Sequence, residues 1–166
     1  MLEDARECLA KVVGCDRNEV IFTSGGTEAN NLAVKGLFAK REGNLIITSA
    51  AEHHAVLDVV EHLEAQGAEV HWLSLNSEGQ IDLDELKTVL ETRGSEVALV
   101  ALMWVNNETG VITPISEVTA LAAKHGVPVH SDAVAAFGHM PTKFAASGLS
   151  TMAITAHKLG GPVGTG

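Results

Sequence analysis

The chain has 166 residues, of which 46% are hydrophobic and 19% are charged, and its formal net charge at pH 7 is −10. This composition predicts a single folded α/β domain and argues against a disordered chain. The acidic balance and the scattered basic residues, of which only Lys40 and Arg41 are adjacent, argue against a nucleic-acid partner.

Short apolar segments alternate along the chain with longer segments of helical period. Strands are expected at Glu19–Thr23, Asn44–Ser49, Glu69–Leu75, Val97–Trp104, Val127–Ser131 and Thr151–Thr155. Helices are expected at Leu2–Val13, Thr27–Arg41, His53–Gln66, Leu83–Thr92 and Ile115–His125. This alternation predicts an α/β three-layer sandwich, with a mainly parallel central sheet covered by helices on both faces. In such sheets, ligands bind beyond the carboxyl ends of the strands.

The start of the fourth expected helix carries a further signal. Asp82 precedes this helix, and Glu85 follows three residues later. The spacing predicts a capping box, in which each side chain accepts a hydrogen bond from the backbone N–H of the other residue.

The first polar motif, TSGGTEANN at residues 23–31, lies between an expected strand and an expected helix. Glycines allow the backbone to approach a ligand closely, and the following helix start offers unpaired N–H groups. Gly26 and Thr27 are therefore candidates for binding a phosphate. The alternative is an ordinary strand-to-helix turn with a polar cap.

The next junction reads AEHHA at residues 51–55. His53 is a candidate to stack on an aromatic ring and to exchange protons near neutral pH. One alternative is a helix-capping turn. Another is a metal pair of His54 and Asp58, but no third ligand stands at a convincing spacing, so no metal is predicted.

A third motif, WVNNETG at residues 104–110, follows another expected strand. Asparagine amides can donate a hydrogen bond to a phenolate-like oxygen. The alternative is a polar turn, because Asn-Asn and Thr-Gly are common turn sequences.

Asp132 and Lys158 each follow an apolar strand segment. Pyridoxal 5′-phosphate (PLP) sites require such a pair, because the amine binds the cofactor aldehyde and the carboxylate keeps the ring nitrogen protonated. Thr155 and His157, in the same TAHK segment as the lysine, are candidates for binding the phosphate. The alternatives are an aspartate that caps a turn and a surface lysine in a glycine-rich loop.

Five motifs together resemble the NifS/IscS-type cysteine desulfurases, which are class V, fold-type I PLP enzymes. They read TSGGTEANN, EHHAV, VNNETG, HSDAV and AHKLGGP, in the family's order, and the resemblance runs over residues 1–166. It implies that Lys158 binds the cofactor covalently and that Asp132 pairs with the ring nitrogen. It further implies that His53 stacks on the ring and helps to move protons, and that Asn107 contacts the ring oxygen. The phosphate ligands that it implies are Gly26, Thr27, Thr155 and His157.

The reaction that the resemblance implies removes sulfur from L-cysteine, leaving alanine and a persulfide on an enzyme cysteine. The sulfur would then pass to an acceptor protein, for iron–sulfur cluster assembly or for other sulfur-containing cofactors, and the enzyme would be a homodimer. One alternative is a selenocysteine lyase or another class V enzyme. A second alternative is a non-catalytic, truncated PLP-binding fragment.

The sequence departs from the family pattern in two respects. Ala135 stands where the family usually has Gln, a second ligand of the ring oxygen. The resemblance also implies that residues 1–166 are a single large PLP-binding domain, which we expect to be incomplete at both ends and without the C-terminal small domain and the loop with the sulfur-accepting cysteine. Neither Cys8 nor Cys15 matches that cysteine.

We expect a cytoplasmic location and no membrane partner. There is no secretory signal and no apolar run long enough to cross a bilayer. Cys8 and Cys15 have neither the spacing of a zinc site nor that of a disulfide framework. We therefore expect both thiols to stay reduced.

Overall fold

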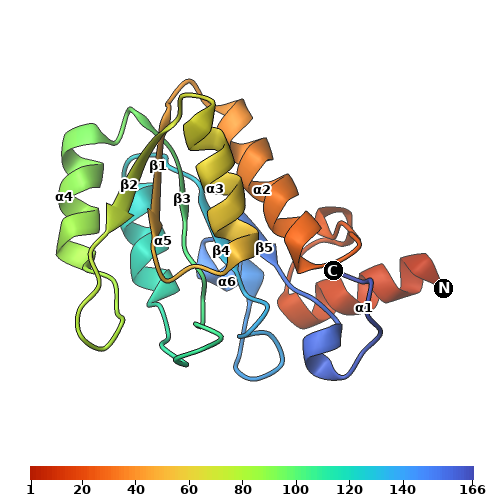
Figure 1. Cartoon of the computed structure of the whole chain (residues 1–166). Helices are drawn as coiled ribbons and strands as arrows, with labels where there is room; N and C mark the ends of the chain where they lie inside the picture. Colours follow the sequence, from red (N-terminus) through yellow and green to blue (C-terminus); the bar gives the residue numbers. More distant parts are fainter.

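The computed structural model describes all of residues 1–166 and contains one parallel five-stranded sheet (Figure 1). The strand order is β2-β1-β3-β4-β5, and every neighbouring pair is parallel. The strands are β1 (Leu45–Ser49), β2 (Glu69–Leu73), β3 (Val97–Ala101), β4 (Val129–Asp132) and β5 (Thr151–Ala153). All five carboxyl ends therefore meet at one edge of the sheet.

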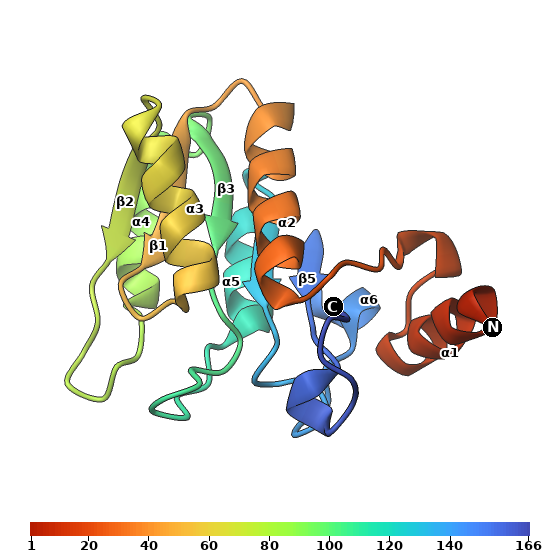
Figure 2. The same cartoon turned by 45° about the vertical axis from the view of Figure 1, so that its right-hand side comes forward.

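Helices cover both faces of this sheet, which confirms the predicted three-layer α/β sandwich. Helices α2 and α3 pack together on one face, and α4 and α5 pack together on the other (Figure 1). Helix α1 lies outside the layers, on the side of β5 (Figure 2). The helices are α1 (Leu2–Val13), α2 (Gly26–Lys40), α3 (His54–Ala65), α4 (Leu83–Arg93), α5 (Ile115–Ala123) and α6 (Phe144–Ser147), with 3₁₀ turns η1 (Arg17–Glu19) and η2 (His157–Leu159).

The central strands are buried on both sides, which explains their continuous apolar sequences. Every residue of β1 and β3 is buried. Because successive side chains point to opposite faces of a sheet, Leu45 and Ile47 join the core under α4 and α5, whereas Ile46 joins the core under α2 and α3. The sequence therefore forms two apolar layers, one on each face of the sheet.

The prediction of a strand at Glu19–Thr23 is wrong. Glu19 ends the 3₁₀ turn η1, and no strand follows it. Thr23 exchanges two backbone hydrogen bonds with Gly166 and forms no longer ladder. The residues of this segment favour a β-strand, but a strand forms only where another strand pairs with it along its length, and no such partner lies beside this segment.

The short helix α6 was not predicted, because four residues are too few to show a helical period. The other expected strands and helices are present with small shifts at their ends. None of the helices combines the length and the apolar character needed to cross a membrane.

Candidate functional site

A cavity of about 160 Å³ opens at the carboxyl ends of the strands. Its walls come from the start of α2, the start of α3, the loop after β3, the end of β4 and the segment after β5. All eight residues that the sequence analysis assigned to a cofactor line it: Gly26, Thr27, His53, Asn107, Asp132, Thr155, His157 and Lys158. Residues more than a hundred positions apart in the chain thus meet in one place.

Asp132, the last residue of β4, is 5% exposed and supplies the negative charge of the cavity. Its Oδ1 accepts a hydrogen bond from the N–H of Val134 at 2.9 Å, and its Oδ2 accepts one from Nδ2 of Asn30 at 2.7 Å. Burial raises the pKa of Asp132, although both hydrogen bonds and the nearby His53 oppose that shift. No cationic side chain forms an ion pair with this carboxylate.

The start of α2 forms another wall. Gly26 and Thr27 are its first two residues, so their N–H groups have no carbonyl partner within the helix. A Cβ atom on Gly26 would lie 3.0 Å from Cγ2 of Val134, so the backbone approaches that side chain closely. Glu28 holds the preceding loop, since its Oε2 accepts a hydrogen bond from the N–H of Ser24 at 2.6 Å. The result is a fixed set of N–H groups at the positive end of a helix.

The segment after β5 adds the basic side chains. Lys158 and His157 are exposed and belong to η2, whereas Thr155 is 4% exposed. Oγ1 of Thr155 lies 2.9 Å from Nδ1 of His157 and donates a hydrogen bond to the carbonyl of Thr165 at 3.0 Å. In this structure Thr155 therefore orients His157, and Nε2 is the imidazole nitrogen that remains available.

His53 and Asn107 complete the polar lining. Nδ1 of His53 accepts a hydrogen bond from the N–H of Ala55 at 3.0 Å, so His53 is the cap of α3. His53 therefore both caps α3, as the alternative reading expected, and lines the cavity. His54, the next residue, is exposed with its Nδ1 3.8 Å from Oδ1 of Asp58. No third side chain joins that pair to form a group able to hold a metal ion.

The two asparagines of the NNET segment differ in their surroundings. Asn106 donates from Nδ2 to the carbonyl of Ala51, and its Oδ1 accepts from the N–H groups of Glu108 and Thr109. Asn106 thus builds the polar turn that the sequence analysis gave as the alternative. Asn107 lines the cavity.

Apolar side chains form much of the rest of the wall. Ala135 lines the cavity with a methyl group, beside Val134, Met103 and Ala55. No amide reaches the cavity from position 135. The departure from the family pattern therefore falls inside the candidate site.

Three buried polar residues near the site were not predicted from the sequence. Asn30 lines the cavity and is fully buried, His130 lies on β4 with 0% exposure, and Glu52 precedes His53 with 7% exposure. A signal was present for His130, because it follows the apolar run Val127-Pro128-Val129 inside an expected strand. Glu52 gave none, because it stands in a polar junction beside His53 and His54. Asn30 gave no such signal, because asparagine on a helix face is usually solvated.

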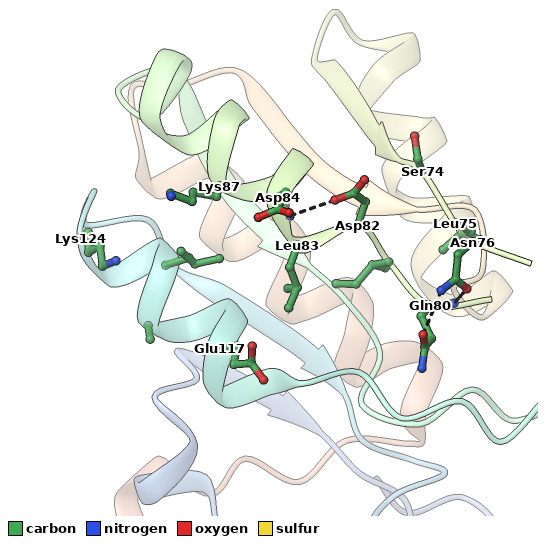
Figure 3. Close-up of a pocket in the computed structure, with 13 residues that line it drawn as sticks. Ser74, Leu75, Asn76, Gln80, Asp82, Leu83, Asp84, Lys87, Glu117 and Lys124 are labelled. Carbon is green, nitrogen blue, oxygen red and sulfur yellow. Dashed lines mark hydrogen bonds between the residues drawn. The ribbon is translucent and has the colours of Figure 1, made fainter. Parts of the chain in front are cut away.

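A larger hollow, of about 790 Å³, lies elsewhere, between the loop after β2 and helices α4 and α5 (Figure 3). Its charged side chains have both signs, since Lys87 and Lys124 line it together with Glu117. Its Asp82 accepts hydrogen bonds from the start of α4. We place the candidate site in the smaller cavity, because only there do the predicted residues meet.

Neither cysteine lines the candidate site. Cys8 is exposed on α1, and Cys15 lines a separate, mainly apolar hollow between α1 and α2. Burial, together with the charges of Glu19 and Asp16, raises the pKa of the Cys15 thiol. The more nucleophilic thiolate form is therefore disfavoured there.

Comparison with known proteins gives a consistent result. Residues 1–166 match the aminotransferase class-V family. The chain is 48% identical to an IscS-like cysteine desulfurase of Mycobacterium tuberculosis, covering 99% of this chain and 43% of that protein. A solved NifS-like protein superposes with a TM-score of 0.93 at 34% identity, covering 99% of this chain and 45% of that one. A structure of SspA in complex with cysteine superposes with a TM-score of 0.91 at 32% identity, covering 99% and 47%. The chain thus spans less than half the length of these relatives.

Proposed function

The chain belongs to the aminotransferase class-V family, and we propose that it is the cofactor-binding part of a PLP-dependent cysteine desulfurase. Members of this family depend on PLP. The observation that carries the proposal is that a buried aspartate and an exposed lysine line one cavity at the ends of adjacent strands. These are Asp132, at the end of β4, and Lys158, just after β5.

The carboxylate end of the cavity fits the protonated ring nitrogen of PLP. Asp132 accepts two hydrogen bonds from the protein, and a carboxylate has about four acceptor sites. It is buried and has no cationic partner in the chain. A cation in the cavity would therefore offset the cost of burying this charge.

The wall formed by the start of α2 fits a phosphate. The N–H groups of Gly26 and Thr27 begin a helix of 15 residues, and a helix start attracts anions through its dipole and its unpaired donors. His157, oriented by Thr155 through Nδ1, brings its imidazole to the same cavity with Nε2 left available. We propose that Gly26, Thr27, Thr155 and His157 form the phosphate site, with Thr155 acting partly through His157.

When bound, PLP supplies an aldehyde that reacts with amines and a ring that withdraws electrons from the substrate carbon. The amine of Lys158 would bind the aldehyde and carry a proton to or from the substrate carbon. His53 would cover one face of the ring, and its Nε2 is available for proton transfer because Nδ1 already accepts from Ala55. The Asn107 amide would donate to the ring oxygen.

We propose L-cysteine as the substrate. The relative in M. tuberculosis is named a cysteine desulfurase, and the similar SspA structure is described as a complex with cysteine. Selenocysteine lyase activity has no such support. The products would be alanine and a persulfide, whose sulfur an acceptor protein would take up for iron–sulfur clusters or for other sulfur-containing cofactors.

The thiol that receives sulfur would not be either cysteine of this chain, because neither lines the cavity. We propose that it belongs to a segment outside residues 1–166, in keeping with the 43% share of the M. tuberculosis relative that the chain covers. A homodimer and a cytoplasmic location, both expected from the sequence, are parts of the same proposal.

The test is to add PLP to the chain and record the visible absorption band of the lysine-bound cofactor. We expect the band in the parent chain and in Lys35→Ala, which changes an exposed lysine of α2. Lys158→Ala should lose the band, because no amine remains at the cavity to bind the aldehyde. Borohydride reduction followed by mass spectrometry should locate the label on Lys158.

Two results would contradict the proposal. A parent chain without the band would exclude a competent cofactor site. A band that survives in Lys158→Ala would exclude this lysine as the anchor.

A further inference from the structure

A chain of hydrogen-bonded side chains, buried except at its far end, leads from Asp132 away from the cavity. Nδ2 of Asn30 donates to Oδ2 of Asp132 at 2.7 Å, and Oδ1 of the same amide lies 2.8 Å from Nε2 of His130. Nδ1 of His130 lies 2.9 Å from Oγ1 of Thr151. The four residues come from α2, β4 and β5, so the chain of hydrogen bonds links three elements.

With a neutral His130, the donors and acceptors of this chain fit one pattern. A carboxylate accepts from the Asn30 amide nitrogen, so the amide oxygen of Asn30 faces His130 and must accept from it. Nε2 of His130 therefore carries a proton. With His130 neutral, Nδ1 is an acceptor and takes the hydroxyl proton of Thr151.

Burial favours the neutral imidazole. His130 has 0% exposure, and its burial lowers its pKa to about 4. No carboxylate touches the ring directly, because the Asn30 amide stands between His130 and Asp132. These hydrogen bonds therefore fix the orientation of the Asp132 carboxylate without placing a charged group beside it.

We propose that Asn30 and His130 are positioning residues that hold Asp132 in the orientation needed to pair with a cationic ring nitrogen. This inference rests on the proposed cofactor site. Without Asn30, one oxygen of Asp132 would lose its buried donor, and the side chain would be fixed only by the N–H of Val134. A charged His130 would instead compete with the cofactor for the aspartate's negative charge.

The first part of the experiment needs neither a variant nor the cofactor. In the chain labelled with ¹⁵N-histidine, long-range ¹H–¹⁵N spectra report which ring nitrogen of each histidine carries the proton. We expect His130 to be a neutral imidazole protonated at Nε2 throughout pH 5.5 to 8, assigned by its absence in His130→Gln. Protonation at Nδ1, or a charged ring at pH 6, would overturn the inference.

The second part compares cofactor affinities by PLP titration of the visible band. Asn30→Leu should raise the dissociation constant about tenfold, the loss expected from one hydrogen bond to a charged group. The matched control is Asn31→Leu, which changes the neighbouring asparagine, whose Nδ2 donates only to the carbonyl of Thr27. The control should bind within about twofold of the parent.

Two substitutions of His130 distinguish the loss of its hydrogen bond to Asn30 from a general loss of packing. His130→Gln retains an N–H donor for Asn30 and should bind PLP nearly as well as the parent. His130→Leu fills similar space without a donor and should weaken binding as Asn30→Leu does. Equal binding by the two His130 variants, or unchanged binding by Asn30→Leu, would overturn this inference alone. A parent chain that binds no PLP would overturn the proposed function and this inference together.

Discussion

At the scale of single residues, identical side chains have different tasks in this protein. The side-chain amide of Asn106 forms hydrogen bonds with the backbone of Ala51, Glu108 and Thr109, whereas Asn107, one position later, lines the cavity. Each asparagine is suited chemically to both tasks. Only their different contacts in the segment after β3 separate the two tasks.

Ala135 is the position at which a substitution should strengthen cofactor binding. It lines the cavity where the resemblance expects a glutamine. We predict that Ala135→Gln lowers the dissociation constant of PLP about fivefold, because one added hydrogen bond contributes about 1 kcal/mol. Titration of the visible band measures this change. Ala135→Leu is the control, since it adds bulk without a donor, and an equal gain from it would refute the hydrogen-bond explanation.

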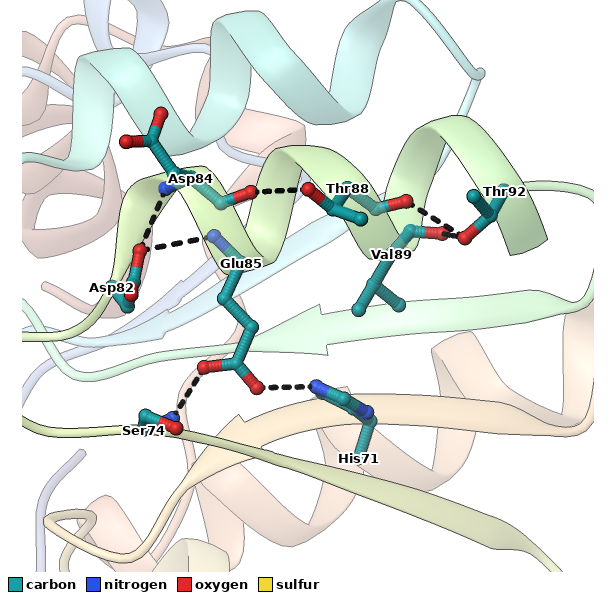
Figure 4. A network of polar contacts seen from close by, with 8 residues as sticks. All are labelled: His71, Ser74, Asp82, Asp84, Glu85, Thr88, Val89 and Thr92. Carbon is teal, nitrogen blue, oxygen red and sulfur yellow. Dashed lines mark hydrogen bonds and ion pairs between the residues drawn. The ribbon is translucent and has the colours of Figure 1, made fainter.

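At the scale of elements, the start of α4 shows how a local signal is partly redirected by a neighbouring strand (Figure 4). Oδ1 of Asp82 accepts from the N–H groups of Asp84 and Glu85, at 2.9 and 3.0 Å, so Asp82 caps the helix as predicted. The reciprocal bond of the expected capping box is absent. The Glu85 carboxylate instead accepts from the N–H of Ser74 and contacts Nε2 of His71, both at 2.8 Å, which ties α4 to β2.

We predict that Asp82→Ala lowers the free energy of unfolding by about 1 kcal/mol, because two N–H groups at the start of α4 lose their acceptor. Urea unfolding followed by circular dichroism gives the value. Asp84→Ala, which removes an exposed carboxylate in the same turn, should cost less than half as much. A loss in Asp84→Ala as large as that in Asp82→Ala would show that charge near the helix start, rather than the cap, is responsible.

At the scale of the whole molecule, Glu52 links the end of β1 to the segment that follows β3. It is 7% exposed, and its Oε1 accepts from the N–H of Met103 at 2.9 Å and from Oγ of Ser49 at 3.4 Å. Oε2 is buried without a partner. Burial raises the pKa of Glu52 to about 8, and the negative charge of Asp132 adds to the shift against the opposing Met103 bond. Glu52 is therefore neutral in the folded protein near pH 7.

This carboxyl group makes folding depend on pH. Its pKa is higher in the folded state than the ordinary value of 4.5, so its stabilising effect is complete below pH 4.5 and is lost as the pH rises to about 8. Over that window we predict a loss of about 1 kcal/mol in unfolding free energy per pH unit. Urea unfolding at several pH values should show that Glu52→Gln lacks this loss. Glu61→Gln, at an exposed position of α3, should keep the parent's slope, and a parallel slope in Glu52→Gln would refute the prediction.

The sequence by itself determined the layered α/β fold, because apolar strand segments and helical periods are local signals that survive in the folded chain. The eight residues proposed for the cofactor site also came from the sequence, through motifs at strand ends and helix starts and through the family resemblance that those motifs carry. Only the tertiary structure decided what surrounds them. The relay from Thr151 through His130 and Asn30 to Asp132, the neutral Glu52 and the failed strand at residues 19–23 all depend on contacts between distant segments. Burial and hydrogen-bond partners of that kind arise only when the sheet and its helices have packed together.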